Sequence, residues 1–138
     1  MGLFCNMQYK DESRGKIQNR VYSTQINDFS NLKFDKITPT DIDGFIDFGN
    51  KVLVFIEVKY KSCSIPNGQR LALERLCDAT HKGGIKSVVL IGRHESSGDI
   101  DVGGLLVAEY RYKQKWVIMN KGLTIREAVL KFKKDLFA

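Results

Sequence analysis

The stretch that decides the fold lies at residues 40–59 and reads T-D-I-D-G-F-I-D-F-G-N-K-V-L-V-F-I-E-V-K. In its first half acidic and apolar residues alternate, and the side chains of a β-strand point to opposite faces of the sheet in turn. Residues 41–48 are therefore predicted to form a strand with one apolar face and one acidic face. Residues 52–61 are rich in β-branched and aromatic side chains, which predicts a second strand beside the first.

The loop between these strands sets which residues face each other. Both apolar faces must meet the same core, so odd-numbered residues must lie beside odd-numbered residues. A three-residue loop at residues 49–51 meets this condition, because it pairs Phe48 with Val52 and places Asp43 directly opposite Glu57. Directly opposed Cβ atoms are about 5 Å apart, and two carboxylates that close repel each other unless a cation lies between them. The hairpin therefore predicts a site for a divalent cation, which prefers carboxylate oxygens.

Lys59 lies two residues beyond Glu57 on the same strand face. Its ammonium group could orient a water molecule for attack on phosphorus, while a metal ion stabilises the developing charge. A half-exposed strand with weak surface ion pairs gives a similar pattern. The near-continuous apolar sequence around the acids favours the metal site, because it indicates a sheet covered on both faces, where charges are costly without a ligand.

The whole sequence predicts an α/β (α+β) fold with a mixed central sheet and flanking helices, in a single domain over residues 1–138. Thr124 and Glu127 form a capping box at the start of the last helix, and a polar, glycine-rich loop is expected at residues 92–104. The resulting element order is αβββαβ, followed by a C-terminal β-hairpin and a helix. Apolar periodicity places helices at residues 12–29, 67–80 and 124–137, and strands at residues 32–37, 41–48, 52–61, 87–91, 105–112 and 116–119.

Composition and charge narrow the class of partner. No apolar run approaches the roughly 20 residues of a membrane helix, and the three cysteines show no C-x-x-C spacing, which fits a reducing compartment. We therefore expect a protein of a reducing, cytosolic compartment, with no membrane partner. From Glu109 onward, eight basic and three acidic residues carry +5 of the net charge of +6, which favours DNA as a partner or forms a solvated basic face.

At the two acidic strands the sequence resembles the PD-(D/E)XK nuclease superfamily. The family pattern is an acid on one strand, a short hairpin and then (Asp/Glu)-x-Lys on the next strand, inside an αβββαβ restriction-endonuclease-like core. Residues 39–44, P-T-D-I-D-G, and residues 57–59, E-V-K, occupy these places here. The resemblance covers residues 12–91 and is nearest to small phage-type and Holliday-junction-resolvase-like members.

The resemblance implies that Asp43 and Glu57 bind Mg²⁺ or Mn²⁺, helped by the backbone carbonyl of Val58, and that Lys59 positions the nucleophilic water. Asp41 is the rival for the first ligand, because its spacing from the preceding proline looks more like the Pro-Asp pair of the family. The inferred register favours Asp43, since it places that residue across from Glu57.

Two further residues are candidates for the same site. Some exonuclease-like family members carry a glutamine on the helix after the lysine, and Gln69 matches that place; an ordinary residue at the start of a helix is the alternative. Many members add a glutamate from the first helix, and Glu12 is the only glutamate in that segment.

Aromatic and basic residues elsewhere could contact nucleic acid. Arg93 and His94 follow a strand and could touch a phosphate, as many loop residues could. Trp116, with Tyr110 and Tyr112, could stack on bases. At alternating spacing in a hairpin, such residues more often pack in the core or across strands.

The expected function is that of a divalent-metal-dependent DNA endonuclease that hydrolyses phosphodiester bonds, with branched or junction DNA among its substrates. Nucleases that cut both strands often dimerise, and residues 105–119 could supply a homodimer interface. The alternatives are a catalytically silent nucleic-acid-binding module and a phage-type partner-binding protein of the same fold.

Overall fold

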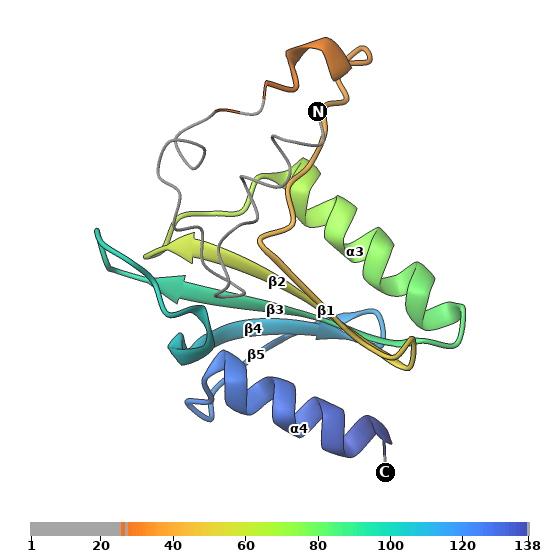
Figure 1. Cartoon of the computed structure of the whole chain (residues 1–138), viewed down its shortest axis with the longest axis vertical. Helices are drawn as coiled ribbons and strands as arrows, with labels where there is room; N and C mark the ends of the chain where they lie inside the picture. The colour runs from red at the N-terminus through yellow and green to blue at the C-terminus, as the bar shows by residue number, and fades with distance from the viewer. Residues whose placement is uncertain (1–25, 27, 138) are drawn as a thin grey trace, which may run out of the picture. The chain divides into compact units, whose positions relative to one another are not determined.

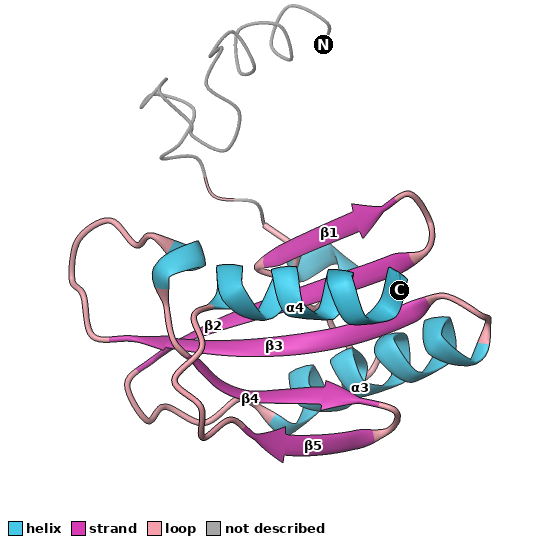
Figure 2. Cartoon of the chain, turned by 90° about the horizontal axis from the view of Figure 1, so that it is seen from below, coloured by secondary structure: helices cyan, strands magenta, loops and turns pink. Residues whose placement is uncertain are grey.

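The computed structural model describes residue 26 and residues 28–137, and the contacts within the chain divide it into two units, Met1–Pro39 and Thr40–Ala138. In the second unit a mixed sheet lies between two helices, α3 (Asn67–Lys82) on one face and α4 (Ile125–Phe137) on the other (Figure 1, Figure 2). This arrangement confirms the predicted mixed α/β class. In order across the sheet, the strands are β1 (Gly44–Phe48), β2 (Val52–Tyr60), β3 (Lys86–His94), β4 (Val107–Tyr112) and β5 (Lys115–Ile118).

The hairpin of β1 and β2 has the predicted register. Its strands are antiparallel, Phe48 pairs with Val52, and the pairing continues to Gly44 opposite Ile56. The three-residue loop contains a glycine and an asparagine with φ of 62° and 63°. These residue types accept positive φ more readily than others, so the loop can close without strain.

The first strand is shorter than predicted. β1 begins at Gly44, so the predicted strand residues Asp41 to Asp43 are not part of it. The physical reason lies at Asp43, whose Oδ2 accepts the backbone N–H of Val58 at 2.8 Å. A side-chain oxygen thus takes the N–H group that a longer strand would have bound through its backbone.

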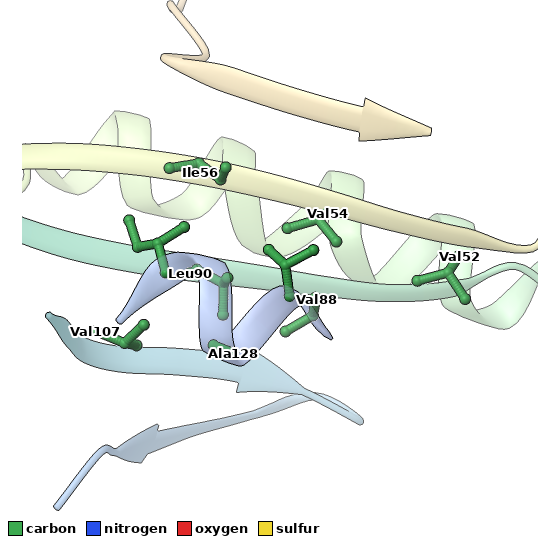
Figure 3. Packing of buried hydrophobic residues seen from close by; sticks show 9 residues of the cluster. Val52, Val54, Ile56, Val88, Leu90, Val107 and Ala128 are labelled. Carbon is green, nitrogen blue, oxygen red and sulfur yellow. The ribbon is translucent and has the colours of Figure 1, made fainter. Parts of the chain in front are cut away.

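The sheet is covered on both faces, as the continuous apolar sequence of β2 predicted. Odd-numbered residues of β2 face α3, and even-numbered residues face α4. The core on the α4 side contains Val52, Val54, Ile56, Val88, Leu90, Val107 and Ala128, which Figure 3 shows from close by. The core on the α3 side contains Leu53, Phe55, Ile65, Leu73, Cys77, Val89 and Ile91.

The second half of the sheet also follows the prediction closely. β3 is parallel to β2 and antiparallel to β4, and β4 and β5 form the predicted hairpin. β3 extends to His94, so the loop predicted from Gly92 begins three residues later; it also contains a 3₁₀ turn, η2 (Val102–Gly104). The capping box is confirmed, because Thr124 and Glu127 each accept the other's backbone N–H, at 3.1 and 3.2 Å.

The predicted first helix, at residues 12–29, lies almost wholly outside the described residues. Its last part is wrong, since Asp28 and Phe29 are not helical and are followed by the 3₁₀ turn η1 (Ser30–Leu32). No helix within residues 28–137 has the length and apolarity needed to cross a lipid bilayer.

The strand predicted at residues 32–37 is also wrong. Phe34 and Ile37 bind each other's backbone groups at 2.8 and 2.9 Å, and between them Asp35 has a φ of 58°. The segment therefore folds back on itself instead of extending. Residues 40–137 have the element order ββαβββα. The predicted αβββαβ order therefore lacks its first strand among the described residues, and its first helix lies almost wholly outside them.

Candidate functional site

Four polar side chains meet on the α3 face of the sheet, near the carboxyl end of β2. Asp43 precedes β1, Glu57 and Lys59 lie on β2, and Gln69 lies in the first turn of α3. Strand alternation puts Glu57 and Lys59 on one face. Leu73 is buried four residues after Gln69, so helical periodicity turns Gln69 toward the same face. These four polar residues are termed the carboxylate cluster.

Glu57 is the buried centre of the cluster, with only 1% of its surface exposed. Its Oε1 accepts hydrogen bonds from Lys59 Nζ at 3.2 Å and from Gln69 Nε2 at 3.0 Å. Its Oε2 is equally buried and has no hydrogen-bond partner among the described residues. A buried carboxylate oxygen without a donor is costly, so this atom is suited to a ligand that the folded chain itself does not provide.

Asp43 lies next to Glu57, as the predicted register requires. Burial raises the pKa of Glu57. The negative charge of Asp43, and a hydrogen bond that the two carboxyl groups can share when one is protonated, raise this pKa further against the opposing effect of Lys59. Asp43 is itself held in place by the N–H of Val58. Two carboxylates that disfavour each other's charge are an arrangement that a divalent cation stabilises.

Gln69 bridges Lys59 and Glu57. Its amide nitrogen donates to Glu57, and its amide oxygen accepts from Lys59 Nζ at 3.2 Å. The amide nitrogen also lies 3.4 Å from the backbone carbonyl of Asp41. The sequence allowed Gln69 to be either a site residue or an ordinary residue at the start of a helix. The structure brings its side chain into the cluster.

The structure separates the two rival aspartates. The carboxylate of Asp43 lies beside Glu57, whereas Asp41 contributes only its backbone carbonyl, to Gln69. Within residues 40–137 the side chain of Asp41 makes no hydrogen bond or ion pair, and its place as the rival metal ligand stays a prediction. Val58 is held there through its backbone N–H. Glu12 lies outside the described residues.

The donor set suits a hard cation with few protein ligands. No three His, Cys, Asp or Glu side chains gather at one place in the described part of the chain. A cation at the cluster would have two carboxylates, Asp43 and Glu57, with the carbonyl of Val58 as the candidate third ligand. Mg²⁺ is commonly bound by one or two carboxylates and retains several waters. The unpartnered Oε2 of Glu57 is consistent with such a ligand set.

A second polar group on the same sheet face was not predicted from the sequence. It joins α3 to β4 and β5 and is termed the helix–hairpin network. Arg111 donates to both carboxylate oxygens of Asp78 at 3.0 and 2.7 Å, and Trp116 Nε1 donates to Glu74 at 2.6 Å. The members of the network are Arg70, Glu74, Asp78, Glu109, Arg111 and Trp116.

The remaining members of that network also pair. Arg70 forms an ion pair with Glu109, and its guanidinium lies 4.3 Å from the ring centre of Trp116. The one local signal was the spacing of Arg70, Glu74 and Asp78, which lie four residues apart on one helix face. Nothing in their spacing identifies partners that are more than 30 residues away.

The aromatic residues of β4 and β5 do not form one stacking surface. Trp116 is engaged in the helix–hairpin network on the α3 side. Tyr110 and Tyr112 pack edge-on against Phe132 on the α4 side, with ring centres 5.4 and 5.7 Å apart. The packing interpretation of these residues is therefore confirmed.

No protein-family model matches the chain, and neither does any curated protein or any solved structure.

Proposed function

We propose that this protein is a divalent-metal-dependent nuclease that hydrolyses phosphodiester bonds in DNA, with the carboxylate cluster as its active centre. The observation that carries the proposal is the buried Oε2 of Glu57, which has no donor within the described residues and lies on a side chain beside Asp43. Structural polar groups are normally satisfied when buried, whereas metal and catalytic sites retain groups that only a ligand satisfies.

The roles follow from the contacts. Asp43 and Glu57, with the backbone of Val58, would hold Mg²⁺ or Mn²⁺. Such an ion, when bound, supplies charge stabilisation at the phosphate and lowers the pKa of a bound water. Asp43 is held for this role by the N–H of Val58, and Glu57 by Lys59 and Gln69.

Lys59 is suited to orient the attacking water. Its ammonium group has three protons to donate, and two are directed to Glu57 Oε1 and Gln69 Oε1, both at 3.2 Å. The third is free to bind a water or a phosphate oxygen, since the side chain keeps 22% of its surface exposed. Gln69 restrains this lysine, so the water would be positioned by a fixed donor.

The proposed substrate is consistent with the net charge of +6. The exposed lysines of α4 contribute to this charge but lie on the helix that covers the opposite face of the sheet, as Figure 1 shows. They are therefore suited to long-range attraction of DNA, and contacts next to the cut bond must come from other residues.

The proposal is tested by incubating the protein with supercoiled plasmid, linear duplex and four-way-junction DNA, with Mg²⁺, with Mn²⁺ or with EDTA. Wild type is expected to cut at least one substrate only when the metal is present. Lys59→Ala should cut none, and Asp41→Asn, a matched control near the cluster, should cut normally.

Metal binding is measured separately by titration calorimetry with Mn²⁺. Glu57→Gln should lose most of the affinity, whereas Asp41→Asn should retain it. The proposal is wrong if wild type cuts none of the substrates while Glu57→Gln binds Mn²⁺ as tightly as wild type. Binding of DNA without any cleavage would instead identify a catalytically silent module.

A further inference from the structure

A hollow of about 1030 Å³ opens at the carboxyl ends of β2 and β3. Figure 1 shows these two strands ending side by side. Lys61, Arg93 and His94, at or just beyond the strand ends, line part of the hollow. An apolar part is contributed by Ile100 and Leu106, the latter with 57% of its surface exposed.

Arg93 links the hollow to the carboxylate cluster through the pairing of β2 with β3. In the parallel pairing of β2 with β3, Lys59 lies beside Arg93, and Glu57 lies beside Ile91. Arg93 therefore lies beside Lys59 of the cluster and two residues, about 7 Å along a strand, beyond the level of Glu57. Ligands of mixed sheets commonly bind at the carboxyl ends of parallel strands, where side chains and loops converge.

Two cations at the hollow have no acidic partner within residues 40–137. Arg93 Nη1 donates to the backbone carbonyls of Lys61 at 3.0 Å and Cys63 at 2.7 Å, which fixes its position without neutralising its charge. The backbone N–H of Lys61 donates to the carbonyl of His94 at 2.7 Å, and the ammonium group of Lys61 lies 5.1 Å from the ring centre of Tyr60. Neither side chain forms an ion pair with any carboxylate in residues 40–137, so both charges remain available to an anion.

Acidic side chains also line the hollow, and they come from the following loop. Glu95, Asp99 and Asp101 belong to that loop, whereas the cations come from the strand ends. A simple anion would bind poorly here, because the acidic side chains would repel it. A nucleotide fits it better, because its phosphate is an anion, its base has an apolar face, and the amino groups of bases donate to carboxylates.

We propose that the hollow is a subsite for one unpaired nucleotide next to the cut phosphodiester. Lys61 and Arg93 bind its phosphate, and Ile100 and Leu106 contact its base. A base inside a duplex is stacked and paired and cannot enter such a hollow. The preferred substrate is therefore DNA with unpaired nucleotides beside the cut, such as a single strand or a branch point. The position beside the cut rests on the proposed nuclease function, whereas the binding itself does not.

Binding is measured by fluorescence anisotropy in EDTA, so that no cleavage occurs, with a labelled single-stranded oligonucleotide and the duplex of the same sequence. Lys61→Ala is expected to weaken binding of the single strand about tenfold and to reduce the slope of log affinity against log salt by about 1. Lys86→Ala removes an exposed lysine at the opposite end of β3 and is the matched control, for which no change is expected.

Two further variants separate the parts of the subsite. Arg93→Lys retains the positive charge but loses the forked guanidinium group, so it should weaken single-strand binding less than Lys61→Ala does. Lysine is chosen because alanine would remove every donor to the carbonyls of Lys61 and Cys63, which follow the end of β2. Leu106→Gln replaces an exposed side chain and should weaken binding of the single strand but not of the duplex.

The subsite is refuted if Lys61→Ala and Lys86→Ala weaken binding equally, or if wild type has no measurable affinity for the single strand at low salt. Cleavage assays with Mn²⁺ distinguish the two proposals. Loss of single-strand binding in Lys61→Ala, with no cleavage by wild type, would support the subsite and reject the nuclease. Metal-dependent cleavage that Lys61→Ala leaves unchanged on single-stranded and branched DNA would support the nuclease and reject the subsite.

Discussion

The carboxylate cluster and the helix–hairpin network lie on the same face of the same sheet and against the same helix, α3. In the network, each carboxylate faces a donor: Asp78 binds Arg111, Glu74 binds Trp116 and Glu109 binds Arg70. In the cluster, Glu57 is more deeply buried than any of these acids, yet its Oε2 has no donor within the described residues. The carboxylates of the network are all paired within the described residues, whereas one oxygen of Glu57 is not.

This difference predicts that the network contributes to stability and the cluster to activity. Removing a member of a satisfied network should lower stability, because its partners are left buried and unpaired. Removing the unsatisfied carboxylate of the cluster should relieve a cost of folding and remove activity. Natural sites commonly retain such unfavourable groups, because activity requires them.

The largest expected effect is on catalysis. Glu57→Gln keeps the shape of the side chain and removes the charge that would bind the metal, so the cleavage rate should fall at least about 100-fold. The measurement is single-turnover cleavage of the best substrate at saturating Mn²⁺. Asp78→Asn, in the network, should change this rate less than about threefold. Equal losses in the two variants would contradict the distinction between the groups.

The next effect is on stability. Asp78→Ala leaves the guanidinium of Arg111 without its two hydrogen bonds and should lower the free energy of unfolding by about 1–3 kcal/mol. Glu57→Gln, measured without metal, should leave this free energy unchanged or raise it. Urea denaturation compares the two variants.

The reactivity of Cys77 provides an independent measure of the same difference. Cys77 is buried on α3, and burial raises the pKa of its thiol to about 12, so it should resist alkylation in the native protein. Asp78→Ala should increase its labelling, and Glu57→Gln should not. The opposite ranking would mean that the cluster, and not the network, holds α3 on the sheet.

A smaller effect is expected where helix and cluster meet. Gln69→Ala removes the amide that restrains Lys59 and Glu57, and the cleavage rate should fall about tenfold with little change in the KM for DNA. Glu74→Ala, one turn further along α3, is the matched control and should affect stability more than rate. A rate equal to wild type in Gln69→Ala would show that the contacts of this glutamine have no part in catalysis.

The smallest expected effect concerns pH. Burial, with the charge of Asp43, raises the pKa of Glu57 in the folded protein. Between its unfolded and folded pKa values the folded state therefore binds more protons, so the free energy of unfolding falls as pH rises through this interval. The stabilisation is complete below the unfolded pKa and lost above the folded pKa.

This pH effect is tested by urea denaturation of metal-free wild type and Glu57→Gln from acidic to neutral pH. The difference between the two should favour wild type increasingly as the pH is lowered. A difference between wild type and Glu57→Gln that does not vary with pH would mean that folding does not change the pKa of Glu57.

Much of the cluster could be predicted from local patterns. Alternation along two adjacent strands and the length of one short loop require Asp43 and Glu57 to be neighbours, because a shift by one residue would place the acids of the two strands on opposite faces of the sheet. Leu73 is on the buried stripe of its helix, and that periodicity brings Gln69 inward. These predictions succeed because strand alternation and helical periodicity can be read from the sequence and determine which side chains share a face.

Other features depend on contacts between distant segments. Asp43 accepts the N–H of Val58, so β1 begins later than predicted, which no residue propensity indicates. The ion pairs of Arg70 with Glu109 and of Arg111 with Asp78 join residues 39 and 33 positions apart. Strand and helix periodicities tell which side of an element is buried, but not which element will cover it. The network, the hollow at the strand ends and the unpartnered oxygen of Glu57 arise only when the folded chain brings these segments together.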